Sequence, residues 1–254
     1  MEKTALITGA TAGFGKAIAL RFASEGYRVI VTGRRSDRLN DLKKEITTRF
    51  ETACLTLNFD VRDRQKTLDV LNHLPTEWQQ VDVLVNNAGL ASGLSHVQDG
   101  DLDDWDKMID TNVKGLLYVS KAILPGMVKR GSGHVINIGS TAGKEVYENG
   151  NVYCASKHAV DAITKGMRID LLGTGVKVTQ IAPGAAETEF SEVRFHGDKQ
   201  RAKDVYKGYQ PMTVEDIAEV TYYVTTLPPH LCINDMVLTS VSQANSFYIH
   251  RKHD

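Results

Sequence analysis

The sequence predicts an α/β fold in which a doubly wound parallel sheet carries helices on both faces. Two observations lead to this prediction: 42% of the 254 residues are apolar, and short apolar runs alternate along the chain with longer amphipathic runs. Short runs bounded by polar residues are typical of buried strands, and the longer runs are typical of connecting helices. Strands that alternate with helices form right-handed crossovers in a parallel sheet. At this length one domain, residues 1–254, accommodates the whole chain.

The first half of the chain contains four predicted strands, each followed by a helix. The strands are the runs TALIT, RVIVT, ACLTLNF and VDVLVNN, at residues 4–8, 28–32, 53–59 and 81–87. The first helix ends at Ser24, the next two cover 37–49 and 63–74, and a long segment that ends at Lys129 follows the fourth strand.

The second half repeats the pattern less regularly. It contains a strand at 134–140, a helix at 153–172, a strand at 176–183 and a helix that begins near Val214. The polar segment 187–212 follows a strand, and ligands of doubly wound sheets bind beyond the carboxyl ends of strands, so we expect this segment to act as a substrate lid. The tail, about 238–254, lacks helical periodicity, and we expect it to reach a partner subunit.

The composition excludes several classes of protein. The formal net charge is −1, with both signs interspersed, which provides no long-range field for nucleic acid or an anionic membrane. The widely spaced Cys54, Cys154 and Cys232 predict neither a disulfide framework nor a metal site. The chain has no signal-peptide pattern at its start and no run long enough to span a membrane, so we expect a cytoplasmic location. The expected partners are a small molecule and further copies of the chain.

A glycine-rich turn follows the first strand. Gly9, Gly13 and Gly15 have the spacing G-x-x-x-G-x-G and open a helix. Glycine is required where backbone turns sharply or approaches a phosphate, and a helix N-terminus offers free N–H groups to a pyrophosphate. The turn therefore predicts dinucleotide binding, and the alternative is a glycine-rich turn without a ligand.

The end of the second strand predicts the type of dinucleotide. An acidic residue there would bind the ribose hydroxyls of NAD, but this chain has Gly33, followed by Arg34 and Arg35. A guanidinium binds a 2′-phosphate through charge-assisted hydrogen bonds, so NADP is favoured. The alternative is that the arginines are solvated, or that Asp37 pairs with one of them.

Two further strand ends carry polar or small residues. Asp60 and Val61 follow the third strand, where an adenine ring would lie, and Asn87, Ala88 and Gly89 follow the fourth. Both groups are also ordinary turn formers, so each is open to a purely structural interpretation.

A hydroxyl, a phenol and an ammonium occur close together in the sequence. Tyr153 and Lys157 are one helical turn apart, and Ser140 ends the preceding strand. An ammonium near a phenol favours the phenolate, so Lys157 is expected to lower the pKa of Tyr153 towards that of a general base. Tyr248 and Lys252 have the same spacing in the charged tail, but no catalytic group lies near them in the sequence.

These residues carry a resemblance to a known family. TGATAGFG, NNAG, Asn112, Ser140, Tyr153 and Lys157 occur in the order and at the spacing of the short-chain dehydrogenase/reductase family, over nearly the whole chain. The resemblance implies a Rossmann-type fold and a catalytic site in which Tyr153 is the acid/base, Lys157 holds the nicotinamide ribose and Ser140 binds the reacting oxygen. Asn112 would anchor a water in a proton relay. The alternatives are a helix residue bonded to backbone for Asn112 and a strand-end cap for Ser140.

The resemblance also implies how NADP is bound. Pro183 and Gly184 would contact the nicotinamide, and Thr188 would bind its carboxamide. The remaining expected cofactor contacts are Gly9, Thr11, Gly13, Phe14, Gly15, Arg34, Arg35, Asp60, Val61, Asn87, Ala88, Gly89, Tyr153 and Lys157.

Within the family the chain resembles the NADP-dependent 3-hydroxy acid dehydrogenases, through TGRRSDRL, MIDTNVKGLLY, INIGSTAGK and TEFSEVRFHGD. Their substrates include serine, allo-threonine, 3-hydroxyisobutyrate and 3-hydroxypropionate. A carboxylate needs a cation, and Arg194 in the lid segment is the candidate because a guanidinium binds a carboxylate at two points. Lys144 is the rival, and Arg194 has the alternative of pairing with nearby acids.

Two other functions remain open on the sequence alone. One is a reductase of another ketone or of a 3-oxoacyl thioester, and the other is a catalytically silent NADP-binding regulator. The family resemblance implies a homotetramer, with a dimer as the alternative.

Overall fold

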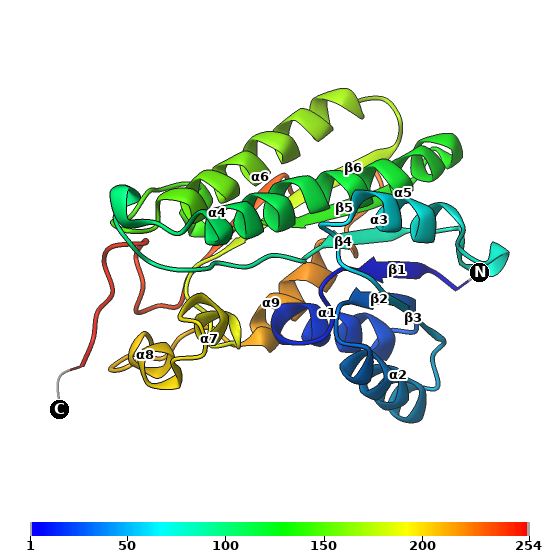
Figure 1. The fold of residues 1–254 in the computed structure, drawn as a ribbon. Helices are drawn as coiled ribbons and strands as arrows, with labels where there is room; N and C mark the ends of the chain where they lie inside the picture. The colour runs from blue at the N-terminus through cyan, green and yellow to red at the C-terminus, as the bar shows by residue number, and fades with distance from the viewer. Residues whose placement is uncertain (1, 253–254) are drawn as a thin grey trace.

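Seven strands form a single parallel sheet in the computed structural model, which describes residues 2–252. The strand order is β3-β2-β1-β4-β5-β6-β7 (Figure 1). The strands are β1 (Thr4–Ile7), β2 (Arg28–Gly33), β3 (Cys54–Asn58), β4 (Val83–Asn86), β5 (Gly133–Ile138), β6 (Val176–Pro183) and β7 (Asp235–Leu238). The order reverses between β1 and β4, which is the point where doubly wound sheets bind their ligands.

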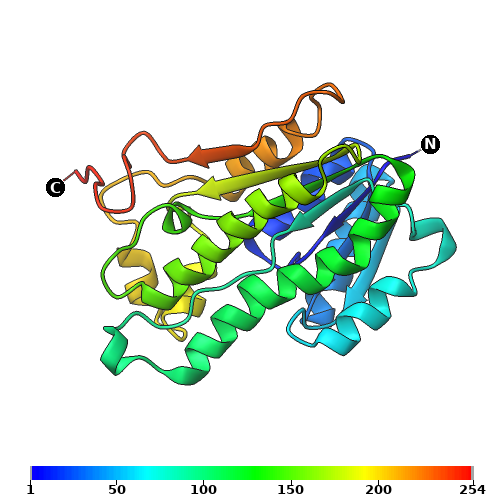
Figure 2. The same cartoon turned by 90° about the horizontal axis from the view of Figure 1, so that it is seen from above.

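Helices cover both faces of the sheet, as the alternating pattern predicts (Figures 1 and 2). One face carries α1 (Gly13–Ser24), α2 (Ser36–Phe50) and α9 (Val214–Tyr223). The other carries α3 (Arg64–Asn72), α4 (Leu102–Ile109), α5 (Leu116–Arg130) and α6 (Asn151–Asp170). A π-helical segment, Asp110–Gly115, joins α4 to α5. Within residues 2–252, no helix has the length and apolar character needed to span a membrane.

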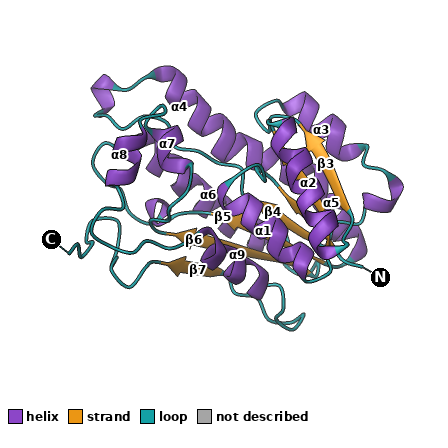
Figure 3. Ribbon diagram, turned by 90° about the horizontal axis from the view of Figure 1, so that it is seen from below, coloured by secondary structure: helices purple, strands orange, loops and turns teal. Residues whose placement is uncertain are grey.

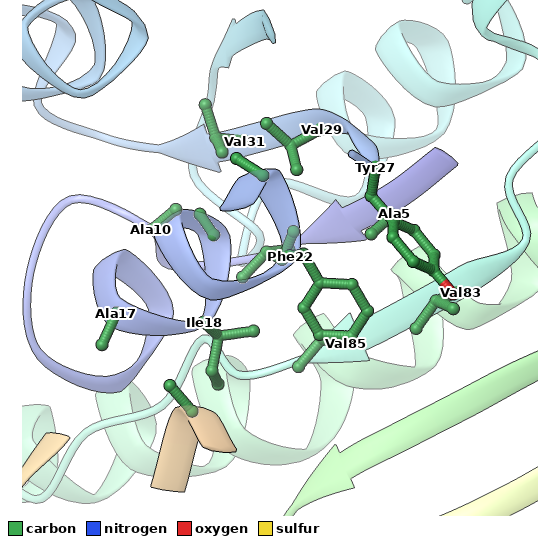
Figure 4. Close-up of a cluster of buried hydrophobic side chains, with 14 of the residues drawn as sticks. Ala5, Ala10, Ala17, Ile18, Phe22, Tyr27, Val29, Val31, Val83 and Val85 are labelled. Atoms are coloured by element: carbon green, nitrogen blue, oxygen red, sulfur yellow. The ribbon is translucent and has the colours of Figure 1, made fainter. Parts of the chain in front are cut away.

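The two faces of the sheet have separate apolar cores. Successive strand residues point to opposite faces, so Ala5 and Ile7 pack on the α1 side while Leu6 packs on the α5 side. On the α1 side, Ile18 and Phe22 of α1 are fully buried against the strands (Figure 4). This packing fixes the start of α1 at the carboxyl end of β1, where the glycine turn lies.

The segments beyond the strand ends differ from the predictions in two respects. The segment 187–212 contains two short helices, α7 (Phe190–Arg194) and α8 (Lys199–Asp204), beside the carboxyl ends of the strands (Figure 3). The edge strand β7 was not predicted: its sequence, DMVL, has only three consecutive apolar residues, and the strand is half exposed.

The C-terminal tail lies along its own chain. The Arg251 guanidinium donates to the carbonyl of Val205 over 2.9 Å, and the amide of Lys252 donates to the carbonyl of Gly208 over 2.7 Å. The described part of the tail is therefore held by the segment that follows α8, and the expected contact with a partner subunit stays a prediction. Residues 253–254 lie outside the described residues.

Candidate active site

A cavity of about 470 Å³ opens at the carboxyl ends of the strands. It is lined by the turns after β1, β2, β3, β4 and β5, by the start of α6, by segment 183–209 and by the tail. The residues expected in the site line this cavity, except Gly15, Asn112 and Lys144. Segments from nearly the whole length of the chain therefore meet at one place.

The glycine turn has the shape that a phosphate cradle requires. Gly9 and Gly13 have φ angles of 67° and 52°, in the left-handed region that favours glycine. A Cβ on Gly15 would lie 2.4 Å from the carbonyl oxygen of Gly9, so only glycine allows the turn to close on itself. The first turn of α1 contains no acidic side chain, which leaves its N–H groups to an anion.

The turn after β4 is bonded to the glycine turn. The side chain of Asn87 donates to the carbonyls of Thr8 and Gly9 over 2.8 and 3.3 Å. In return, the Thr8 hydroxyl accepts the amides of Asn87 and Ala88 over 3.0 and 2.9 Å. The two turns at the switch point in the strand order form one rigid floor for the cavity.

The end of β2 has no room for an acidic side chain. A Cβ on Gly33 would lie 2.5 Å from the Thr11 methyl carbon. Arg34 lines the cavity with 59% of its side chain exposed, and its nearest carboxylate, on Asp60, is 3.8 Å away. Within residues 2–252, Asp37 forms no ion pair. Arg34 is thus positively charged and weakly paired, as a 2′-phosphate site requires.

The second arginine is already bound to neighbouring side chains. Arg35 donates to the Thr11 hydroxyl over 2.9 Å and to the carboxylate of Glu189 over 3.2 Å. Arg38, which the sequence analysis did not select, donates to the same carboxylate over 2.7 and 2.9 Å. The arginines after β2 therefore bridge the glycine turn to the start of segment 187–212.

Tyr153 and Lys157 are buried in the first two turns of α6. The Lys157 ammonium donates to the carbonyl of Ile138 at the end of β5, over 2.9 Å. Ser140 accepts the amide of Ala142 over 3.1 Å, so it caps the short helix Thr141–Gly143 as well as facing the cavity. The three side chains predicted to move a proton are brought together.

Asn112 lies in the π-helical segment and is fixed by three hydrogen bonds. Its Oδ1 accepts the amide of Leu90 over 2.8 Å, while its Nδ2 donates to the Leu90 carbonyl and to the Ser156 hydroxyl over 2.8 and 2.9 Å. Both amide protons are used in this way. The side chain holds the turn after β4 beside α6, and its role in a water relay stays a prediction.

Burial controls the pKa values of the catalytic groups. It raises the pKa of Tyr153, to which the nearby phenol of Tyr147 adds, whereas a hydrogen bond from Ser140 and the charge of Arg194 oppose the shift. Burial also lowers the pKa of Lys157, to about 8. The predicted lowering of the Tyr153 pKa is therefore reversed in this structure, because desolvation of the phenolate outweighs the neighbouring charges.

Arg194 places its guanidinium above two aromatic rings of the cavity. It is 5.3 Å from the ring centre of Tyr147 and 5.7 Å from that of Tyr153. Its Nε and Nη2 atoms are buried without a hydrogen-bond partner, and among residues 2–252 no carboxylate pairs with it. The rival Lys144 instead pairs with Asp161 over 2.5 Å and also with Asp235.

The sequence analysis missed several cavity residues. Phe190 packs edge-on against Tyr153, with ring centres 5.6 Å apart. Gln243 of the tail accepts the amide of Ala185 over 2.9 Å and lines the cavity. Tyr147 lies six residues before Tyr153, within the same short stretch, which is the one signal in the sequence that pointed to it.

Comparison with known proteins agrees with this geometry. The profile of the short chain dehydrogenase family matches residues 3–199. A protein named NADP-dependent 3-hydroxy acid dehydrogenase YdfG, from Salmonella typhi, is 49% identical over 240 residues, which cover 94% of this chain and 95% of that protein. Sulfoacetaldehyde reductase 2 from Chromohalobacter salexigens is 45% identical over 249 residues, 98% of each chain.

A solved structure gives the same result for the fold. The closed form of serine dehydrogenase complexed with NADP⁺ superposes with a TM-score of 0.92 at 46% identity, covering 98% of this chain and all of that one. The sequence motifs, the sheet order and these similarities agree over almost the full length of the chain. The chain belongs to the short chain dehydrogenase family.

Proposed function

We propose that the protein is an NADP-dependent oxidoreductase that interconverts a small 3-hydroxy acid with its 3-oxo acid or semialdehyde. The candidate substrates are serine, allo-threonine, 3-hydroxyisobutyrate and 3-hydroxypropionate. Action on a CH–OH group with NADP agrees with the names of the similar proteins. The substrate class rests on one observation: Arg194 brings buried, unpaired N–H groups to the ring of Tyr153.

The residues at the strand ends fit an NADP molecule. The glycine turn and the start of α1 would hold the pyrophosphate, and Arg34 the 2′-phosphate, because Thr11 fills the place of an acidic side chain at Gly33. Thr188 and the turn at Pro183 would hold the nicotinamide. When bound, NADP supplies the acceptor or donor of the hydride.

Residues of α6 and of the turn after β5 would move the proton. In alcohol oxidation, the Tyr153 phenolate takes the proton of the substrate hydroxyl, and Ser140 keeps that oxygen in place by a hydrogen bond. The charge of Lys157 would favour the phenolate against the burial that raises the pKa of Tyr153. Reduction runs through the same groups in the opposite direction.

Substitution of Arg194 with Met tests the substrate class. A charge-assisted hydrogen bond contributes about 1.5–3 kcal/mol, so the KM for a 3-hydroxy acid should rise about 10- to 150-fold. The KM for a neutral alcohol of similar size should change less than about twofold. Arg201→Met is the matched control, because Arg201 also stands over an aromatic ring of the lid segment, Phe195, but does not line the cavity. Equal effects of Arg194→Met on both substrates would contradict the proposal.

A substrate panel separates the alternatives. Sulfoacetaldehyde is included because one relative bears the name of its reductase and a guanidinium also binds a sulfonate. An acetoacetyl thioester tests reduction of 3-oxoacyl groups. Tight binding of NADPH without turnover of any member of the panel would indicate a regulator instead of an enzyme.

An assembly and a location are also proposed. A homotetramer, or alternatively a dimer, agrees with the family and with exposed apolar side chains such as Ile169 and Leu172 at the end of α6 and Val237 on the edge strand. Light scattering of the purified protein measures this directly. A cytoplasmic location agrees with the free cysteines and is checked by fractionation.

A further inference from the structure

The lid segment is anchored to the rest of the chain at Arg194 itself and two residues after it. The carbonyl of Arg194 accepts the amide of Gly93 over 3.0 Å. Two residues later, Nε2 of His196 lies 3.1 Å from Oδ2 of Asp104, on α4. Both anchors belong to the segment that follows β4, which is far from the lid in sequence. The backbone that carries the Arg194 side chain is therefore held at two neighbouring points.

Asp104 is the centre of this attachment. Its side chain is only 8% exposed, although it carries a carboxylate. Besides His196, it accepts the Ser92 hydroxyl over 2.7 Å and the Lys107 ammonium over 3.3 Å. Gly93 has a φ of 73°, and a Cβ there would lie 2.9 Å from Oδ2 of Asp104. A glycine is needed at this position because the carboxylate and the lid approach the same stretch of backbone.

The backbone of His196 has an unusual conformation. Its φ of 53° lies in the left-handed region, which non-glycine residues seldom adopt. The side chain is 62% exposed and is not part of an apolar core. Among the described residues, the side chain contacts Asp104. This interaction offsets the energetic cost of the left-handed backbone at His196.

We propose that Asp104 and His196 are positioning residues that fix the Arg194 guanidinium over Tyr153, and thereby determine how tightly an anionic substrate binds. This inference rests on the proposed function, in which Arg194 binds the substrate carboxylate. Neither residue touches the substrate; both act through the backbone of the lid.

The two anchors would hold the Arg194 guanidinium in its binding position before the substrate arrives. The guanidinium of Arg194 lies on the Tyr147 and Tyr153 rings and forms no ion pair with the residues from 2 to 252, so these contacts leave its N–H groups free to shift sideways. Anchoring the backbone at residues 194 and 196 restricts that movement before the substrate arrives. A two-point contact between guanidinium and carboxylate depends on such alignment, and a displacement of about 1 Å can cost up to about 100-fold in rate.

Three histidine variants test the inference. His196→Asn keeps a residue that tolerates the left-handed backbone but is too short to reach Asp104. We expect the KM for a 3-hydroxy acid to rise about tenfold, with the KM for a neutral alcohol and the Kd for NADPH unchanged within about twofold. His196→Gln places a donor at the length of the imidazole and should restore most of the lost affinity. His73→Asn is the matched control, since His73 pairs with Asp69 over 3.3 Å on the distant α3.

A double substitution makes the test independent of simple unfolding. If His196 acts through Arg194, His196→Asn should add little to the KM of an Arg194→Met protein, so the two effects are not additive. Additive effects, or an equal rise in KM for the neutral alcohol, would overturn the inference while leaving the substrate class intact. If Arg194→Met alone does not discriminate between the two substrates, the proposed substrate class fails, and the positioning role fails with it.

Discussion

Replacing Arg34 with Ala should weaken the binding of NADPH much more than that of NADH. The two cofactors differ only in the 2′-phosphate, and Arg34 is the weakly paired guanidinium at the end of β2. Arg35 is bonded to Thr11 and Glu189, so it cannot simply take over the contact without losing other hydrogen bonds.

The size of the effect follows from the exposure of the side chain. Charge-assisted hydrogen bonds contribute about 1.5–3 kcal/mol, and the lower end applies because the Arg34 side chain is 59% exposed and screened by solvent. A loss of about 1.4 kcal/mol corresponds to a tenfold change in affinity, so the Kd for NADPH should rise about tenfold. The 3.8 Å contact with Asp60 is too long and exposed to matter for folding, and the stability should change by less than about 0.5 kcal/mol.

Fluorescence titration with NADPH and NADH at two salt concentrations measures the prediction. The Kd for NADH should change less than about twofold, and the loss for NADPH should shrink as salt screens the phosphate. Arg49→Ala is the control, because Arg49 lies on the same side of the sheet, in α2, and pairs with Glu45 away from the cavity. An equal loss of affinity for both cofactors would refute the assignment of Arg34 to the phosphate.

Three further substitutions test other parts of the structure. Tyr153→Phe removes only the phenol oxygen and should lower kcat about 100- to 10,000-fold in steady-state assays, with NADPH binding unchanged in titration. Gly15→Ala puts a methyl group 2.4 Å from the carbonyl of Gly9, so thermal denaturation should report a loss of about 1–3 kcal/mol together with weaker binding of NADPH. His134 is buried and its pKa is lowered to about 3, so the unfolded chain binds its proton first as the pH falls below about 6.5. The variant His134→Gln keeps a hydrogen-bond partner for Thr179 but has no proton to bind. Between pH 6.5 and pH 3, its free energy of unfolding should therefore fall by up to about 1.4 kcal/mol per pH unit less than that of the parent, as measured by urea unfolding. Parallel curves for the two proteins would contradict this.

Local patterns in the sequence were sufficient for the fold and for the floor of the cavity. Strand and helix runs depend on neighbouring residues, so their predicted bounds lie close to those of β1 to β6 and of the main helices. The edge strand β7 was missed because its apolar run, MVL, is short, and the pairing with β6 that makes it a strand is not visible in the sequence. The long segment predicted to end at Lys129 contains α4 and α5, joined by a π-helical segment that no composition signal marked.

Long-range contacts account for what the sequence did not reveal about the site. Acids near Arg194 in the sequence were considered as its partners, but the fold places one of them, Glu189, against Arg35 and Arg38. The pKa of Tyr153 was predicted from the neighbouring Lys157, whereas burial in the folded chain reverses its direction. Both outcomes depend on residues that are distant in sequence and adjacent only after folding.

The attachment of the tail has a consequence for how the protein is made. The ribosome releases residues 239–252 after every other part of the cavity, yet Gln243 and Arg251 line that cavity and the tail is bonded to the segment beside α8. A nascent chain can fold its sheet from the N-terminal strands onwards, but its cavity stays incomplete until translation has passed this point. The dinucleotide would then stabilise finished chains in preference to truncated ones, so translation errors that shorten the tail would yield protein that cofactor protects poorly from proteolysis.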